Sequence, residues 1–212
     1  MTTAFARKNS LPRLRRRNSR KAPSQERARV TVEALLDATA QLLVSEGFDN
    51  ASTNRIAAKA GVSVGSLYQY FDGKEALVAA LAERHHAQLM AVLASAAADM
   101  GDRSLDAVVR DIVCAMLEAH AVDPKLHEVL TEQIPRDVIT CCLEEDGAAF
   151  VRGLLEIHRD KIRKDLDLGL ATFILVHAVE GVTHAAVIGR PAMLKDKKLA
   201  SDIARMVTGY LT

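Results

Sequence analysis

The sequence predicts an all-α fold of about nine helices. Hydrophobic residues make up 49% of the 212 residues and aromatic residues only 4%, with many Ala and Leu, a composition that favours helix over sheet. No stretch alternates convincingly at the period of two that a half-buried strand requires. Apolar residues recur instead at helical spacing between Gly and Pro breaks. The chain is long enough for a small N-terminal module and a larger C-terminal one.

The expected helices follow these breaks. A first helix is expected over residues 25–46, where Leu35, Leu36 and Leu43 lie on one apolar stripe and Gly47 ends the helix. Asp72 is expected to cap a long helix that ends near residue 98 and bridges the two modules. The later helices are expected at 104–121, 124–135, 136–162, 168–189 and 197–211.

Residues 53–71 (TNRIAAKAGVSVGSLYQYF) predict two short helices joined by a three-residue turn. Gly61 suits the left-handed conformation that closes a helix, and Ser63 is a good N-cap for the second helix. Apolar positions in the run allow the two helices to cross and pack. Small and hydrogen-bonding residues lie between these apolar positions, as they do in a helix that enters a DNA groove. The run therefore predicts DNA reading.

The polar side chains of this run suit different parts of DNA. Hydroxyl and ammonium groups suit phosphate oxygens, whereas Gln69 suits adenine and Arg55 suits guanine. For Tyr68, packing beneath the helix is the alternative to DNA contact. The predicted DNA-contacting residues of this region are Thr53, Arg55, Val64, Gly65, Ser66, Tyr68, Gln69, Tyr70 and Lys74.

Charge is distributed unevenly along the chain. The net charge is only +1, yet residues 1–22 hold eight Lys or Arg and no acidic residue. The composition of residues 1–24 predicts a disordered basic arm, and the rest of the chain is acidic overall. We expect Arg15, Arg16 and Arg17 to enter a minor groove or follow phosphates. A solvated tail with no role is the alternative.

The run at 53–71 also resembles the DNA-binding segment of bacterial TetR-family repressors. The family pattern matches Thr53 and the segments Ile-Ala at 56–57, Ala-Gly-Val-Ser at 60–63, Leu-Tyr at 67–68, Tyr-Phe at 70–71 and Lys-Glu-Ala-Leu at 74–77. Many members carry Lys where this chain has Val64, so one expected contact is missing. The resemblance covers about residues 25–77 in sequence. It implies a module at 25–72 that binds a double-stranded DNA operator, a ligand-binding and dimerisation domain at 73–212, and release of the DNA by an effector.

The C-terminal part is expected to form a dimer and to hold a small molecule. The helix at 168–189 is apolar on nearly every side and must be covered on every side, so the last two long helices are expected to pair with a second copy. It is interpreted as a core helix and not as a membrane span. The ligand is expected to be mainly apolar with one polar group. The pocket candidates are His86, Leu89, Met90, Met116, His120, Phe150, Phe173 and His177.

Other classes of function are less well supported by the sequence. A helical enzyme would need an acid–base or metal constellation, and the only weak candidate is the face formed by His177, Glu180 and His184. We therefore expect no metal, no cofactor and no catalytic activity. A ligand-blind architectural DNA-binding protein is the other alternative. The vicinal pair Cys141 and Cys142 is interpreted as core thiols, with oxidant sensing as the alternative, in a cytoplasmic protein.

Overall fold

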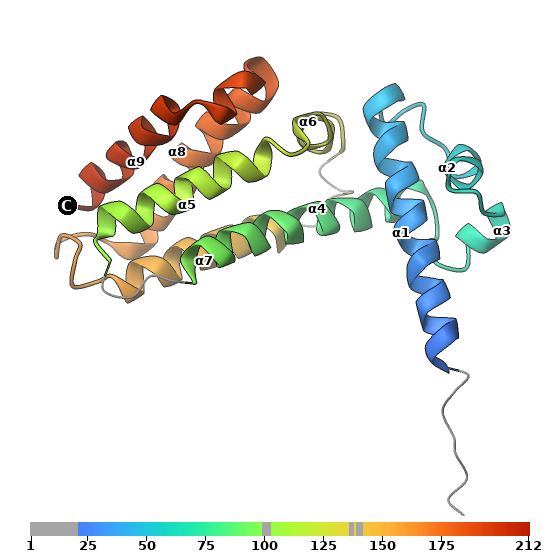
Figure 1. Ribbon diagram of the computed structural model, residues 1–212, viewed down its shortest axis with the longest axis horizontal. Coiled ribbons are helices and arrows are strands. Elements are labelled where there is room, and N and C mark those ends of the chain that lie inside the picture. Colours follow the sequence, from blue (N-terminus) through green and yellow to red (C-terminus); the bar gives the residue numbers. More distant parts are fainter. Residues whose placement is uncertain (1–20, 99–102, 136–137, 139–141) are drawn as a thin grey trace, which may run out of the picture.

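The protein is a two-module helical molecule in which one long helix joins the modules (Figure 1). The computed structural model describes residues 21–98, 103–135, 138 and 142–212. Within these residues there are nine α-helices, one short 3-10 helix and no strand, so the predicted fold class is confirmed. The elements are α1 (Lys21–Glu46), α2 (Thr53–Ala60), α3 (Val64–Leu67), α4 (Lys74–Ala97), α5 (Leu105–His120), α6 (Pro124–Glu132), α7 (Cys142–Ile157), α8 (Leu168–Gly189), η1 (Pro191–Lys195) and α9 (Lys197–Leu211).

The core of the N-terminal module is built by α1, α2 and α3 together with parts of α4 and α6. Leu43 of α1, Ile56 of α2 and Leu67 of α3 are fully buried in it, and so is Leu77 in the first turn of α4. Leu130 of α6 packs into the same core from the C-terminal part of the chain. Residues on both sides of the domain boundary predicted between residues 72 and 73 therefore share one hydrophobic core. The division into domains at 25–72 and 73–212 stays a prediction.

A second core lies among α5, α7, α8, η1 and α9. Leu117 of α5 and Leu211 of α9 are almost completely buried in it, and Leu155 of α7 and Leu175 of α8 complete its centre. In Figure 1, α4 runs from beside α1 toward α5 and α7, so a single helix contacts both modules. At about 1.5 Å per residue, its 24 residues span about 36 Å.

Several element boundaries differ from the prediction. The first helix begins at Lys21, within the segment predicted to be a disordered arm. The second helix of the DNA-reading run ends at Leu67, because Gln69 and Tyr70 form tighter turns whose amides donate three residues back. The helix expected at 136–162 ends at Ile157 and is followed by turns, so its expected end at residue 162 is wrong; α7 is described from Cys142 onward.

The expected cap at Asp72 is wrong. The N-cap of α4 is Gly73, which has an extended φ of 174°, and no side chain caps this helix. Asp72 stands one residue too early to accept a hydrogen bond from the first turn. Asp123 does cap α6, since its carboxylate accepts a hydrogen bond from the amide of Leu126 at 3.0 Å.

Candidate DNA-binding surface and ligand pocket

The turn between α2 and α3 has the predicted geometry of a helix-turn-helix. Gly61 adopts the left-handed conformation, with φ 71° and ψ 27°, and closes α2. Ser63 caps α3, because its hydroxyl accepts a hydrogen bond from the amide of Ser66 at 3.0 Å. Ile56 and Leu67 are fully buried on either side of the turn, so their packing fixes the angle between the helices. The polar residues of α3 are thus held on a rigid support.

Most predicted DNA contacts at α3 lie on the outer surface of this support. Gly65 and Gln69 are exposed, and Tyr68 and Tyr70 keep 53% and 39% of their surface accessible. Ser66 is partly exposed and lies 2.8 Å from the Ser63 hydroxyl. Hydroxyls carried on exposed aromatic rings can reach phosphate oxygens. Tyr68 therefore does not pack beneath the helix.

Val64 differs from its neighbours, because it is partly buried and packs against the N-terminal core. Its side chain supports α3 at the position where a basic residue would point outward. We infer that its role is packing.

The other predicted contacts already have partners within the module. The Thr53 hydroxyl lies 3.3 Å from the Tyr68 hydroxyl, which places both groups at the same edge of the surface. Arg55 pairs with the carboxylate of Glu46 and also donates to the Asn50 carbonyl at 3.2 Å. These bonds join α2 to the end of α1, so DNA contact by Arg55 requires an exposed ion pair to open, which costs about 0–1 kcal/mol.

Lys74 is held by Phe48. Its ammonium donates to the Phe48 carbonyl at 3.0 Å and lies 4.0 Å from the centre of the Phe48 ring. Arg15, Arg16 and Arg17 lie outside the described residues, as does Cys141.

A pocket of about 130 Å³ lies in the C-terminal module between α4, α5, α7, α8 and α9. Its walls are almost entirely aliphatic, and Met116 and Phe150 line it as predicted. Leu93 reaches it from the second half of α4. The six other predicted residues do not line this pocket, namely His86, Leu89, Met90, His120, Phe173 and His177.

Three of these six residues have other environments because they lie on other faces of their helices. His86 lies 3.4 Å from the carboxylate of Asp146. Phe173 and His177 are exposed on α8, where their rings meet edge to face at 4.3 Å. A fourth, His120, is buried in a cluster of histidines at the far end of α5.

The sequence interpretation missed two polar residues that line the pocket. His158, at the end of α7, is 4% exposed, and its Nε2 has no hydrogen-bond partner among the described residues. Glu180 of α8 also lines the pocket, beside Gly147 of α7. His158 follows Val151 and Leu155 at helical spacing within the helix expected at 136–162, so periodicity could have identified it as part of this face.

One face of α8 is apolar and uncovered. Leu170, Phe173, Ile174, Val182 and Ile188 are all exposed, and Gly181 lies among them. By length and composition alone, α8 is long enough and apolar enough to span a membrane, and only 33% of its most apolar stretch is buried within the chain. A single chain thus leaves part of α8 uncovered, which fits the expectation that a second copy is needed to cover this helix; the dimer itself stays a prediction.

The helix-turn-helix, the long connecting helix and the pocketed helical module define a class of DNA-binding transcriptional regulators. Two family models match the chain: the model of bacterial regulatory proteins of the tetR family covers residues 35–81, and the model of the tetracyclin repressor-like C-terminal domain covers residues 104–211. The chain therefore belongs to the TetR family of transcriptional regulators.

Named relatives and solved structures agree with this assignment. An uncharacterised helix-turn-helix regulator of Pseudomonas putida, TtgW, is 34% identical over 122 residues, which is 57% of this chain and 81% of TtgW. The fatty acid degradation regulator FadR from Bacillus halodurans shares the fold, with a TM-score of 0.69 at 19% identity over 84% of this chain and 95% of FadR. The SmeT–triclosan complex has a TM-score of 0.63 and 26% identity, over 83% of this chain and 90% of SmeT.

Proposed function

We propose that the protein is a ligand-responsive repressor that binds a palindromic operator as a homodimer. The observation that carries this proposal is α4, whose Leu77 lies in the core of the DNA-binding module and whose Leu93 lines the pocket. A group bound in the pocket thus touches the same helix that supports the helix-turn-helix. The DNA-contacting surface is α3 with the turn that follows it, where Ser66, Gln69 and Tyr70 lie outside the core.

The exposed face of α8 supports the dimer. Five large apolar side chains on one helix are costly to leave in water, since each contributes about 1.5–3 kcal/mol when fully buried. A Cβ added at Gly181 would meet no atom within 4 Å, so a partner helix has room to approach closely. On α9, Met206 is exposed as well. A dimer in which α8 and α9 pack against α8 and α9 of a second chain carries two DNA-binding modules. An operator with two-fold symmetry requires two such modules.

The pocket supports an apolar effector with one polar group. Its aliphatic walls favour an apolar body, and the unpartnered Nε2 of His158 favours one hydrogen-bonding group on the ligand. SmeT, which shares 26% identity, was solved with triclosan, an aromatic molecule with a hydroxyl group. We therefore expect a ligand of this chemical kind for the present protein.

The size of the pocket suggests how binding releases DNA. A pocket of about 130 Å³ is close to the roughly 150 Å³ that holds benzene, so we expect α4, α7 or α8 to move when a larger effector is enclosed. Movement of α4 shifts its first turns, which pack under α1 and α2. The effector then favours a spacing of the two reading modules that does not match the operator.

The DNA-binding part is tested by selecting fragments from random DNA with the purified protein. We expect enrichment of one sequence with two-fold symmetry, and its presence upstream of a reporter should lower expression. Enrichment without a shared sequence would support the architectural alternative, and the proposed repressor would then be incorrect. A repressor acts on DNA in the cell interior, so the proposal also implies a cytoplasmic protein.

The effector part is tested by filling the pocket. Gly147 lines the pocket, and the nearest atom to a Cβ added there is a carboxylate oxygen of Glu180 at 3.8 Å, so Gly147→Leu introduces a side chain without a backbone clash. We expect the variant to bind the operator normally but to resist release by triclosan-like phenols. Gly153→Leu on the same helix is the control, since a Cβ added there meets nothing within 4 Å and the residue does not line the pocket. Equal responses of both variants would contradict an effector site in this pocket.

A further inference from the structure

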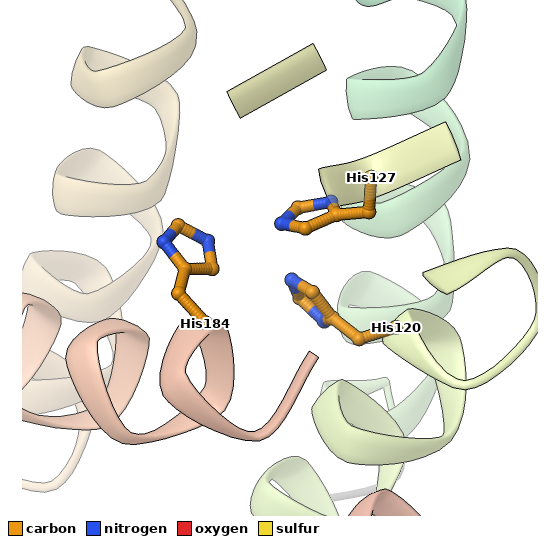
Figure 2. A group of neighbouring side chains, drawn as sticks. All are labelled: His120, His127 and His184. Carbon is orange, nitrogen blue, oxygen red and sulfur yellow. The ribbon is translucent and has the colours of Figure 1, made fainter. Parts of the chain in front are cut away.

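Four of the seven histidines meet at one place outside the pocket. His85 of α4, His120 of α5, His127 of α6 and His184 of α8 come from four different helices. The ring centres of His120 and His127 are 4.5 Å apart, and those of His127 and His184 are 4.9 Å apart. Figure 2 shows the rings of His120, His127 and His184 converging on one small space. Each of the three residues offers a ring nitrogen within 4.8 Å of the other two.

We infer that His120, His127 and His184 form a binding site for one divalent transition-metal ion of the zinc type. The sequence predicted no metal site, because the spacing of His177, Glu180 and His184 along one helix is not diagnostic. The structure separates those three residues and brings His184 to partners from α5 and α6. The inference goes beyond the proposed function, since the site is distinct from the effector pocket and shares no residue with it.

The hydrogen bonds around the cluster prepare the rings as ligands. Nδ1 of His120 lies 2.8 Å from the carbonyl oxygen of Met116, so Nδ1 carries the proton and Nε2 keeps its lone pair. Nδ1 of His127 lies 3.0 Å from Nε2 of His85. When His127 donates in this bond, its Nε2 is also free to bind a metal ion. His85 is a positioning residue in this arrangement.

The strongest single observation is the Nε2 atom of His127. The residue is 6% exposed, and this nitrogen has no hydrogen-bond partner among the described residues. A buried polar atom without a partner costs about 1–3 kcal/mol. A metal ion between the three rings would satisfy this nitrogen. Burial also lowers the pKa values of all three histidines, so the rings are neutral near pH 7 and need not lose a proton to bind.

The ligand set indicates which metals fit. Three imidazoles and no carboxylate suit zinc, cobalt, nickel or copper, whereas magnesium and calcium prefer oxygen ligands. Three protein ligands leave a fourth tetrahedral position open for water or another donor. Metal–nitrogen bonds of about 2.0–2.1 Å bring ligand nitrogens to about 3.3 Å from one another, so the rings must rotate inward slightly.

A metal ion at this site would join the two modules. His127 lies on α6, whose Leu126 and Leu130 pack into the core of the DNA-binding module, and His184 lies on α8. Coordination therefore ties α6 to α8 and should hold the modules in one relative position. An effect on operator binding rests on the proposed function, but metal binding itself does not.

The test measures binding of Zn²⁺ and Co²⁺ to protein purified without a polyhistidine tag. We expect one Zn²⁺ per chain by calorimetry, a rise in Tm on Zn²⁺ addition, and the intense visible bands of tetrahedral Co²⁺. His184→Gln should abolish the bands, and His85→Gln should weaken affinity by about 10- to 100-fold. His177→Gln, an exposed histidine on the same helix, should bind as the original protein does.

Two results would overturn the inference. One is the absence of stoichiometric binding to the folded original protein, and the other is unchanged binding by His184→Gln. Circular dichroism of metal-free His184→Gln shows whether the variant is folded, and if it is not, the Co²⁺ bands and the weakened affinity of His85→Gln decide the question. Loss of operator recognition by every variant and by the original protein would refute the proposed function while leaving the metal site intact.

Discussion

Nε2 of His85 lies 3.0 Å from Nδ1 of His127, which joins α4 to α6 at the place where the two modules meet. Both helices also contribute to the core of the DNA-binding module, through Leu81 and Leu130. The core of the DNA-binding module therefore includes residues of two helices from the C-terminal part, α4 and α6. Only α4 follows the DNA-binding module directly in sequence. Because α4 and α6 both contact α1, a movement of either helix can displace α1 directly.

Replacing Gln69 tests base reading by the turn that follows α3. Gln69→Ala removes an exposed amide beside a rigid helix-turn-helix, so the fold should keep its Tm. We expect operator binding to weaken by about 1–3 kcal/mol, with relaxed preference at one base pair of each half-site. Fluorescence anisotropy with the selected operator and its single-base variants measures both effects. Gln41→Ala, another exposed glutamine in the same module, is the control. Equal affinities for the two variants would refute base contact by Gln69.

Removing the arm tests whether it contributes charge to DNA binding. A deletion of residues 1–20 removes seven Lys or Arg and leaves α1 complete. The slope of log affinity against log salt should become shallower by about 0.9 for each phosphate that the arm neutralises in the full-length protein. Titrations at several salt concentrations measure the slope. An unchanged slope would mean that Arg15, Arg16 and Arg17 do not contact DNA.

Features that depend on a few neighbouring residues were predictable from the sequence. Gly61 and Ser63 terminate and start helices through their own backbone and side chain, and the structure confirms both. The limits of α8 and α9 were also predicted correctly, because Gly189 with Pro191 and the chain end are strong signals. The predicted cap at Asp72 was wrong by one residue, because α4 is capped by Gly73. The exact first residue of a helix depends on how the following turns pack and not only on local sequence preference.

The pocket and the histidine cluster were not predictable, because they depend on how helices pack. Periodicity assigns a residue to a face of its own helix but does not identify the helix opposite. His120 was expected to line the pocket, but it lies in the cluster with His127 and His184, which come from two other helices. Phe173 was expected in the pocket because it is aromatic, but it faces outward on the uncovered side of α8.

A charge at Gly181 tests the dimer. Gly181→Glu places a carboxylate in the middle of the uncovered apolar face of α8, where an added side chain meets no atom of its own chain. The isolated chain should stay folded, because glutamate favours helix over glycine by about 0.5–1 kcal/mol. We expect a monomer by light scattering and loss of operator binding. Gly153→Glu on α7, also in open space, should stay dimeric. A dimeric Gly181→Glu would place the interface elsewhere.

The stability of the metal-free protein should fall in mild acid because of the buried histidines. Burial, the largest cause, lowers the pKa of His120 to about 4 and that of His127 to about 2. Smaller downward contributions come from the neighbouring histidines, and the Met116 carbonyl opposes the shift at His120. Histidine in an unfolded chain titrates near pH 6.5. Above this pH both states are neutral and these residues add no pH dependence.

Below about pH 6.5 the unfolded chain takes up protons that the folded chain rejects, so the free energy of unfolding decreases by about 1.4 kcal/mol per pH unit for each histidine. The contribution of His120 levels off near its folded pKa of about 4, and that of His127 continues to about 2. Urea unfolding with a chelator at several values between about pH 7 and about pH 5 measures this slope. His127→Gln should remove about 1.4 kcal/mol per pH unit from it, whereas the exposed control His177→Gln should not. Identical slopes for the two variants would mean that His127 takes up a proton in the folded protein as readily as in the unfolded chain.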